Sequence, residues 1–145
     1  MLPSSIRAFL ASGPLGHVVT LDEDGSGQVS MAWVGAEGDE LVIGTMPDQA
    51  KLRNLRRDPR IVISFESPKR NEWGLNEYLV VHGRARVTEG GAAPLLQRLA
   101  HVYLGPDVTF PGTTDPALGW VIRVTPERIV GIGPWRDAEA APEER

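Results

Sequence analysis

The apolar positions of this chain fall mostly into short runs of alternating or β-branched residues, which is the pattern of β-strands. Runs at 17–21, 28–34 and 40–45 are separated by segments rich in Gly, Asp, Glu and Ser, so they predict a hairpin that continues into a meander. Further strands are expected at 61–65, 76–88, 118–124 and 128–132. Gly83, inside the longest run, predicts a bulge or bend. Six or seven antiparallel strands suit a small barrel.

Three other segments predict α-helices. Residues 3–12 and 92–103 repeat apolar side chains at spacings of three and four. A shorter helix is expected from about Met46 to Arg57, because Pro47 suits a first helical turn and Asp58-Pro59 ends a helix. The segments 66–74 and 106–116 are predicted loops, and residues 136–145 a polar tail.

The helix predicted at 46–57 is basic, although the chain has a formal net charge of −4. Its cations, with one just beyond it, are Lys51, Arg53, Arg56, Arg57 and Arg60. A helix N-terminus attracts anions, and Thr45, Lys51 and Asn54 add a hydroxyl, a cation and an amide. This combination predicts a phosphate site. The alternative is a solvated helix whose arginines keep it soluble while Leu52 and Leu55 pack inward.

The run KLRNLRRDP at 51–59, six residues after Thr45, matches the motif K-x-x-N-L-x-R-D-P. It resembles the pyridoxamine 5′-phosphate oxidase-like split-barrel flavoproteins, and most closely the branch that uses the deazaflavin coenzyme F420 in place of FMN. The resemblance extends over residues 1 to about 133. It implies a mostly β fold, the split β-barrel of FMN-binding proteins, with one cofactor-binding domain at 1–135 and the tail at 136–145.

The resemblance also implies which residues bind the cofactor. The phosphate-bearing part would contact Thr45, Lys51, Asn54 and Arg57. The ring would lie on the strand that carries Gln28, Ser30 and Met31, for which ordinary alternation along a half-buried strand is the alternative. Members of the family pair as homodimers with the cofactor between the subunits, and the matching positions of the partner's long strand are Tyr78, Val81 and His82.

One departure from the family pattern concerns the choice of cofactor. FMN-dependent members usually carry Arg directly before the phosphate-binding Lys, and here Ala50 precedes Lys51. F420 fits better, because its phosphodiester and oligoglutamate tail would follow Arg53, Arg56 and Arg57 across the surface. The expected function is hydride transfer from reduced F420 to a small electron-poor organic acceptor. An FMN-binding flavin reductase or pyridoxamine phosphate oxidase-like enzyme, and a non-catalytic cofactor-binding protein, are the alternatives.

Composition limits the remaining function classes. The chain has no cysteine, so redox chemistry must come from a cofactor rather than from thiols or iron–sulfur clusters. No metal site is expected, because His17, His82 and His101 share no ligand spacing. No apolar run approaches the roughly 20 residues of a membrane span, and a cytoplasmic location is predicted. A mild acidic balance and the lack of aromatics near the basic helix argue against nucleic acid. No catalytic residue is assigned; Tyr78, His82 or water would supply a proton.

Overall fold

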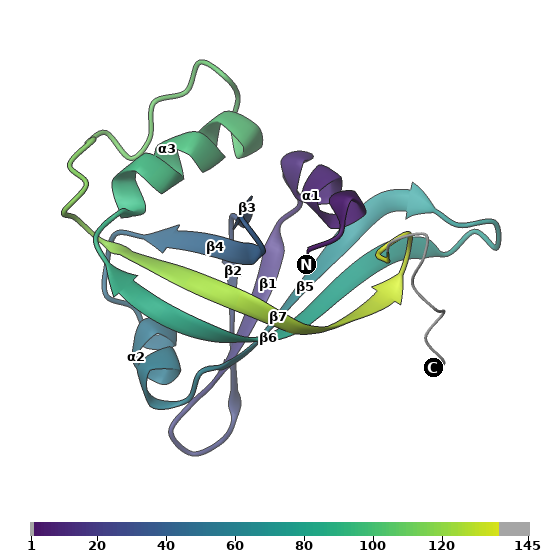
Figure 1. Cartoon of the computed structure of the whole chain (residues 1–145), viewed down its shortest axis with the longest axis horizontal. Helices are drawn as coiled ribbons and strands as arrows, with labels where there is room; N and C mark the ends of the chain where they lie inside the picture. The colour runs from purple at the N-terminus through teal and green to yellow at the C-terminus, as the bar shows by residue number, and fades with distance from the viewer. Residues whose placement is uncertain (1, 137–145) are drawn as a thin grey trace.

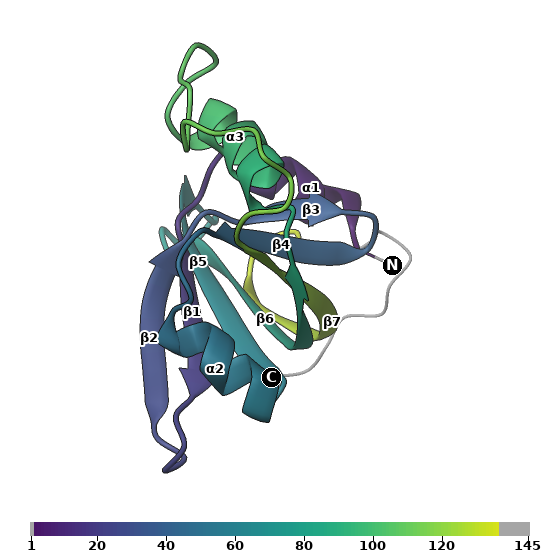
Figure 2. The same cartoon turned by 90° about the vertical axis from the view of Figure 1, so that its left-hand side faces the viewer.

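The computed structural model describes residues 2–136, and these residues form one seven-stranded antiparallel sheet with three short helices. The sheet order is β2-β1-β5-β6-β7-β4-β3, so β2 and β3 are its edges. The sheet coils strongly, with β4 and β7 facing β1 and β2 across the interior (Figures 1 and 2). This architecture confirms the mostly β split barrel. The strands are β1 Gly16–Leu21, β2 Gly27–Ala32, β3 Gly35–Glu37, β4 Glu40–Thr45, β5 Arg60–Arg70, β6 Asn76–Glu89 and β7 Trp120–Ile132.

The helices close the barrel from two sides. In both views α1 (Ser4–Ala11) and α3 (Ala92–Tyr103) lie toward the top, and α2 (Ala50–Arg57) lies at the bottom (Figures 1 and 2). α3 packs on β4, α1 on β3, and α2 on β1 and β6. α1 and α3 confirm the helices predicted at 3–12 and 92–103. No helix among residues 2–136 has the length and apolar character needed to cross a membrane.

The interior of the barrel is filled by alternate residues of the strands, as period-2 geometry requires. The buried side chains of β5 and β6, for example, are Ile61, Ile63 and Phe65 on one strand and Leu79 and Val81 on the other. α2 adds Leu52 and Leu55 to the same core, as its sequence predicted. Because β5 and β6 pair over most of their length, these inward residues form continuous rows.

The opposite face of five strands, which we call the outer face, is also largely apolar. One cross-strand row runs Met31, His17, Ser64, Val80 and Val130, and the next runs Val29, Val19, Val62, His82 and Arg128. Met31 and Val29 are 54% and 58% exposed. The long strand β6 carries apolar residues on both faces, with Leu79 and Val81 inside and Val80 on the outer face. Among residues 2–136, Met31 and Val29 thus keep most of their apolar surface exposed.

Four predicted boundaries are wrong. β5 continues to Arg70, so the predicted loop at 66–74 shrinks to a turn between β5 and β6. The predicted turn at 35–39 contains the short strand β3. The two last strands are one, β7, because it pairs with β6 on both sides of a register shift between His82 and Gly83. An irregularity thus occurs beside Gly83, as expected, but the extra residue of the bulge is Glu127 on β7. At Gly83 itself an added Cβ would lie 2.5 Å from the Thr125 carbonyl oxygen.

The fourth boundary matters for function, because α2 begins at Ala50 and not at Met46. The Thr45 hydroxyl donates to the Pro47 carbonyl at 3.1 Å, and Gln49 is still extended. Pro47 therefore lies in a tight turn that precedes α2. Because α2 begins only at Ala50, Lys51 lies in the first turn of the helix. The predicted tail at 136–145 lies outside the described residues, apart from Arg136.

Candidate cofactor-binding site

Lys51 is the most unusual polar residue of the structure. Its side chain is only 6% exposed, and it makes no ion pair or hydrogen bond with any residue in the range 2–136. Burial lowers the pKa of its ammonium group, because the charged form loses its hydration. Buried cations are ordinarily paired. Since no residue in the range 2–136 neutralises Lys51, its position suits the binding of an anion from outside this part of the chain.

The surroundings of Lys51 favour the same kind of guest. It lies in the first turn of α2, and no side chain caps this helix, since Gln49 makes no such hydrogen bond. Free N–H groups and the positive end of the helix dipole thus face the same region as the ammonium group. Thr45, which is 6% exposed, ends the preceding strand next to this turn. The β4–α2 junction combines a cation, backbone donors and a hydroxyl.

Lys51 opens into a cleft of about 250 Å³ between β2, β4, α2 and α3. Its polar lining comes from the β4–α2 junction, with Thr45, Gln49 and Lys51. The rest of its side-chain lining is apolar and comes from other elements: Leu15, Met31, Ala32, Trp33, Leu96 and Phe110. A molecule with an anionic group and a flat apolar part would match both halves.

The three predicted residues of β2 divide between two faces. Gln28 and Ser30 point inward, and the Gln28 side-chain oxygen accepts from the Thr20 hydroxyl at 3.2 Å. The Ser30 hydroxyl is buried and makes no hydrogen bond within the described part of the chain. Met31 points to the outer face and reaches the cleft at the sheet edge. Of the three, Met31 lies in the cleft, and Ser30 carries a second unsatisfied buried polar group.

Asn54 and Arg57 are engaged elsewhere. The Asn54 amide donates to the Thr20 hydroxyl at 3.0 Å and to Asp22 at 2.9 Å. Arg57 donates to the side-chain oxygen of Asn54 at 3.1 Å and to the Leu21 carbonyl. These contacts tie α2 to the β1–β2 hairpin, and both residues line a separate hollow of about 500 Å³. The cofactor-binding role predicted for Asn54 and Arg57 stays a prediction.

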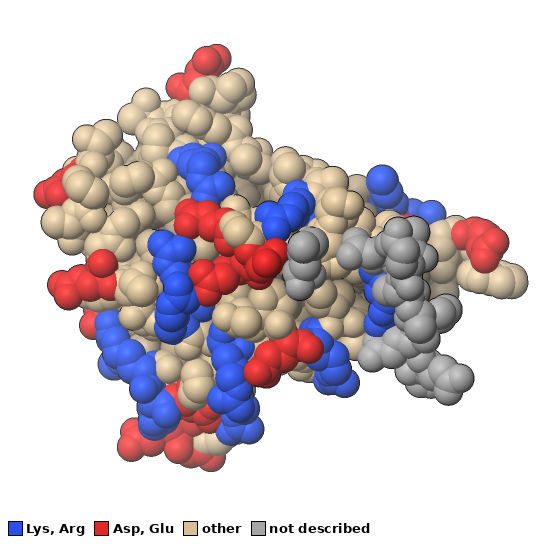
Figure 3. Space-filling model, viewed as in Figure 1, with Lys and Arg blue, Asp and Glu red and all other residues tan. Residues whose placement is uncertain are grey.

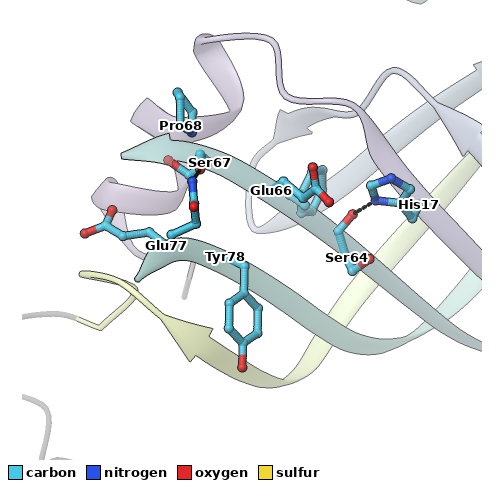
Figure 4. A pocket seen from close by; sticks show the side chains of 9 residues that line it. His17, Ser64, Glu66, Ser67, Pro68, Glu77 and Tyr78 are labelled. Atoms are coloured by element: carbon cyan, nitrogen blue, oxygen red, sulfur yellow. Dashed lines mark hydrogen bonds between the residues drawn. The ribbon is translucent and has the colours of Figure 1, made fainter. Parts of the chain in front are cut away.

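Tyr78 and His82 lie on the outer face rather than in the cleft of their own chain. Tyr78 borders an open hollow of about 940 Å³, together with His17, whose Nδ1 lies 3.1 Å from the Ser64 carbonyl oxygen (Figure 4). His82 lies 3.2 Å from the Arg128 guanidinium. Burial, and to a smaller extent the charge of Arg128, lower the pKa of His82. Neither residue lines the Lys51 cleft, and the cofactor-binding role predicted for Tyr78 and His82 stays a prediction.

The basic patch around α2 is partly neutralised. Lys and Arg side chains gather at the lower left of the molecule, with Asp and Glu among them (Figure 3). Arg56 pairs with Asp48 at 3.1 Å, and Arg60 pairs with Asp58 at 2.7 Å. Arg53 is exposed and makes no ion pair among residues 2–136. Of the three arginines along which an anionic tail is predicted to run, Arg53 is therefore the one whose charge is not engaged by another described residue.

Comparison with known proteins identifies the family. The sequence profile described as pyridoxamine 5′-phosphate oxidase matches residues 2–132. This chain belongs to the pyridoxamine 5′-phosphate oxidase family. The family resemblance inferred from the 51–59 motif is thereby confirmed.

Solved structures of the same fold agree with this assignment to the pyridoxamine 5′-phosphate oxidase family. An F420 reductase shares 25% identity at a TM-score of 0.71, covering 89% of this chain and 98% of its own. A conserved hypothetical protein from Mycobacterium tuberculosis shares 22% identity at a TM-score of 0.70, covering 90% and 84%. A candidate pyridoxamine 5′-phosphate oxidase from Listeria innocua shares 19% identity at a TM-score of 0.64, covering 88% and 95%.

For this member of the pyridoxamine 5′-phosphate oxidase family, the sequence indicated the cation of the cleft but not its walls. Trp33, Leu96 and Phe110 line the cleft from β2, α3 and the loop that follows α3. No spacing pattern links residues so far apart in the chain. Phe110 lies in a segment that the sequence predicts only as a loop. Within residues 2–136 no group of three or more His, Asp or Glu side chains is placed to hold a metal ion.

Proposed function

We propose that this protein is an oxidoreductase that binds coenzyme F420 and transfers hydride from its reduced form to a small electron-poor organic acceptor. The observation that carries the proposal is Lys51, a buried cation at an uncapped helix N-terminus that has no counter-ion among residues 2–136. The likeness to an F420 reductase at 25% identity supports the deazaflavin over other anionic cofactors.

The choice of F420 over FMN rests on two features near Lys51. Ala50 precedes it, so the cation that FMN-dependent members usually carry there is missing. Arg53 lies exposed two residues further on without an ion pair among the described residues, which suits an anionic tail that leaves the cleft along α2. A single flavin phosphate would need only the Lys51 end.

The cofactor would lie between two subunits. The cleft of about 250 Å³ is smaller than the roughly 300–1,000 Å³ typical of sites for cofactor-sized ligands. Met31 belongs both to this cleft and to the apolar outer face, so a second copy that covers the outer face would also enlarge the site. Tyr78 and His82 of that face are the residues that a partner would contribute.

The chain's own part in the reaction is placement. The bound coenzyme supplies the hydride. Lys51 would neutralise an anionic group of the cofactor and thereby set its position along the cleft. The apolar lining, including Trp33, would exclude water from the reacting carbon. Tyr78 and His82 remain candidates for the proton that follows the hydride, and no catalytic residue is assigned.

Thermal unfolding with added cofactor tests the proposal. A ligand at 100 times its Kd stabilises the folded state by about 2.7 kcal/mol, which raises the melting temperature of a chain of this size by roughly 5–10 °C. F420 should produce this shift, and FMN at the same concentration should produce less. Oxidation of reduced F420 by nitroaromatic and quinone acceptors then tests hydride transfer. A larger rise in melting temperature with FMN would mean that FMN, and not F420, is the cofactor. Binding of F420 without turnover would mean that the protein binds the cofactor without catalysis.

A further inference from the structure

The loop between α3 and β7 contributes an aromatic wall to the cleft. Phe110, midway along this loop, is 40% exposed and lines the cleft. Its ring meets Trp33 edge to face, with the centroids 5.3 Å apart and an interplanar angle of 64°. The two rings therefore form adjoining aromatic surfaces at the side of the cleft that carries no charged residue.

Trp33 is the fixed member of this pair. Its ring stacks on Tyr103 at 5.5 Å and 14°. The Tyr103 hydroxyl donates to the Pro14 carbonyl at 2.6 Å and accepts from the Val34 N–H at 3.0 Å. These hydrogen bonds join α3 to the chain on either side of the β1–β2 hairpin, so Trp33 has little freedom to move.

Phe110, in contrast, depends on one side chain. Gln97 of α3 donates from Nε2 to the Val108 carbonyl at 2.8 Å and accepts the Phe110 N–H at 3.1 Å. One amide thus holds the loop on both sides of residue 109. The other backbone hydrogen bonds of the loop lie toward its ends, such as the one from the Gly91 N–H to the Pro116 carbonyl. Without Gln97 the aromatic wall would lose its attachment to α3.

We propose that Phe110 is a specificity-determining residue that limits the width of a planar, uncharged acceptor, and that Gln97 is the positioning residue that holds it over the cleft. The inference rests on the proposed function. Lys51 would hold the anionic part of the cofactor, and the apolar residues, among them Leu15 and Leu96, offer an acceptor no counter-charge. The two rings are in edge-to-face contact, so no molecule fits between them, and Phe110 instead closes one side of the cleft, where a wide flat molecule would meet it before a narrow one.

Two quinones of different width test the wall with reduced F420 as donor. Menadione has two fused rings and 9,10-phenanthrenequinone has three, and both are flat, uncharged and electron-poor. Phe110→Ala should raise the ratio of kcat/KM for the wide over the narrow quinone by about tenfold, the range in which pocket size discriminates substrates. Both quinones are compared at saturating F420, so that a change in cofactor affinity does not enter the ratio, and Phe110→Leu should restore part of the discrimination. An unchanged ratio in Phe110→Ala would overturn the proposal.

The role of Gln97 has its own readout. Gln97→Met, which keeps the length of the side chain but makes neither hydrogen bond, should shift the ratio in the same direction. The double variant Gln97→Met with Phe110→Ala should have the same ratio of kcat/KM for the wide over the narrow quinone as Phe110→Ala alone, because Gln97 acts through Phe110. Gln97→Glu keeps an acceptor for the Phe110 N–H and should lie between wild type and Gln97→Met. Additive effects in the double variant would refute a positioning role.

The affinity of the protein for the two quinones tests this inference separately from the proposed function. If the wild-type protein reduced neither quinone, hydride transfer would be wrong, and the wall would be tested from the Kd values of the two quinones by quenching of tryptophan fluorescence. The ratio of the two Kd values should then change in Phe110→Ala by the same factor. Circular dichroism and melting temperature would establish that every variant is folded. An unchanged ratio of the two Kd values in Phe110→Ala would refute the role of Phe110 in limiting width, whether or not the protein transfers hydride.

Discussion

Replacing Lys51 by methionine should weaken cofactor binding without weakening the fold. Methionine keeps most of the length and apolar volume of the side chain but removes the charge. In the free protein Lys51 is 6% exposed with no counter-ion among residues 2–136. Its charge therefore costs free energy in the folded state and gains it only when an anion binds.

The two effects have opposite signs and separate magnitudes. Loss of a charge-assisted contact corresponds to about 1.5–3 kcal/mol of binding free energy, or roughly a 10- to 150-fold rise in the Kd of F420. Removal of an unpaired buried charge should raise the free energy of unfolding of the cofactor-free protein, on the order of 1 kcal/mol. A lysine that served only packing or solubility would show neither the loss of affinity nor the gain of stability.

Fluorescence titration with F420 and urea unfolding without it measure the two quantities. Lys69→Met is the matched control, because it is the same substitution at an exposed position of β5. It should change the Kd by less than about threefold, since exposed charges are screened by salt. An unchanged Kd in Lys51→Met would place the anion elsewhere. A large loss of stability would mean that Lys51 has a structural role that this conformation does not account for.

The pKa of Lys51 adds a dependence on pH. Burial lowers this pKa below its ordinary 10.5, so between the two values the unfolded chain holds more protons than the folded one. The free energy of unfolding of the cofactor-free protein should therefore rise with pH in that window. Affinity for an anionic cofactor should fall over the same window, because binding needs the ammonium form. Both trends should disappear in Lys51→Met, and their persistence would assign them to other groups.

Three further predictions concern other parts of the molecule. Sedimentation at micromolar concentration should give a dimer, and Val80→Asp on the outer face should give a folded monomer; a monomeric wild type would contradict the shared site. Arg53→Glu should weaken the binding of long-tailed F420 more than that of short-tailed F420, and it should reduce the salt dependence of the Kd. Arg56→Glu should have a smaller effect, because Arg56 already pairs with Asp48. Equal losses of affinity for both tail lengths in Arg53→Glu would count against a tail along α2. Because the pKa of His82 is lowered, the unfolded chain binds more protons below about pH 6.5, so stability should fall on acidification below that pH and fall less in His82→Gln, as urea unfolding would measure.

Several features of this protein were readable from local sequence because their physical causes are local. The longest apolar run, at 76–88, predicted a strand, and β6 extends over Asn76–Glu89. Gly83 predicted an irregularity, and the pairing of β6 with β7 does shift between His82 and Gly83, although the extra residue lies on β7. The motif at 51–59 indicated both the family and the buried cation of the cleft, since a short helix between two strands brings its first turn next to the end of the preceding strand.

Tertiary structure alone decided how the predicted site residues are distributed. Lys51, Thr45 and Met31 meet in one cleft, Asn54 and Arg57 join the hairpin network, and Tyr78 and His82 lie on the outer face. It also decided the continuity of β7 and the start of α2, because a turn ahead of Ala50 and pairing across a bulge depend on contacts with distant strands. The aromatic wall of Trp33 and Phe110 had no signal in the sequence, since an edge-to-face contact between residues 77 positions apart arises only when α3 and its loop fold back over the end of β2.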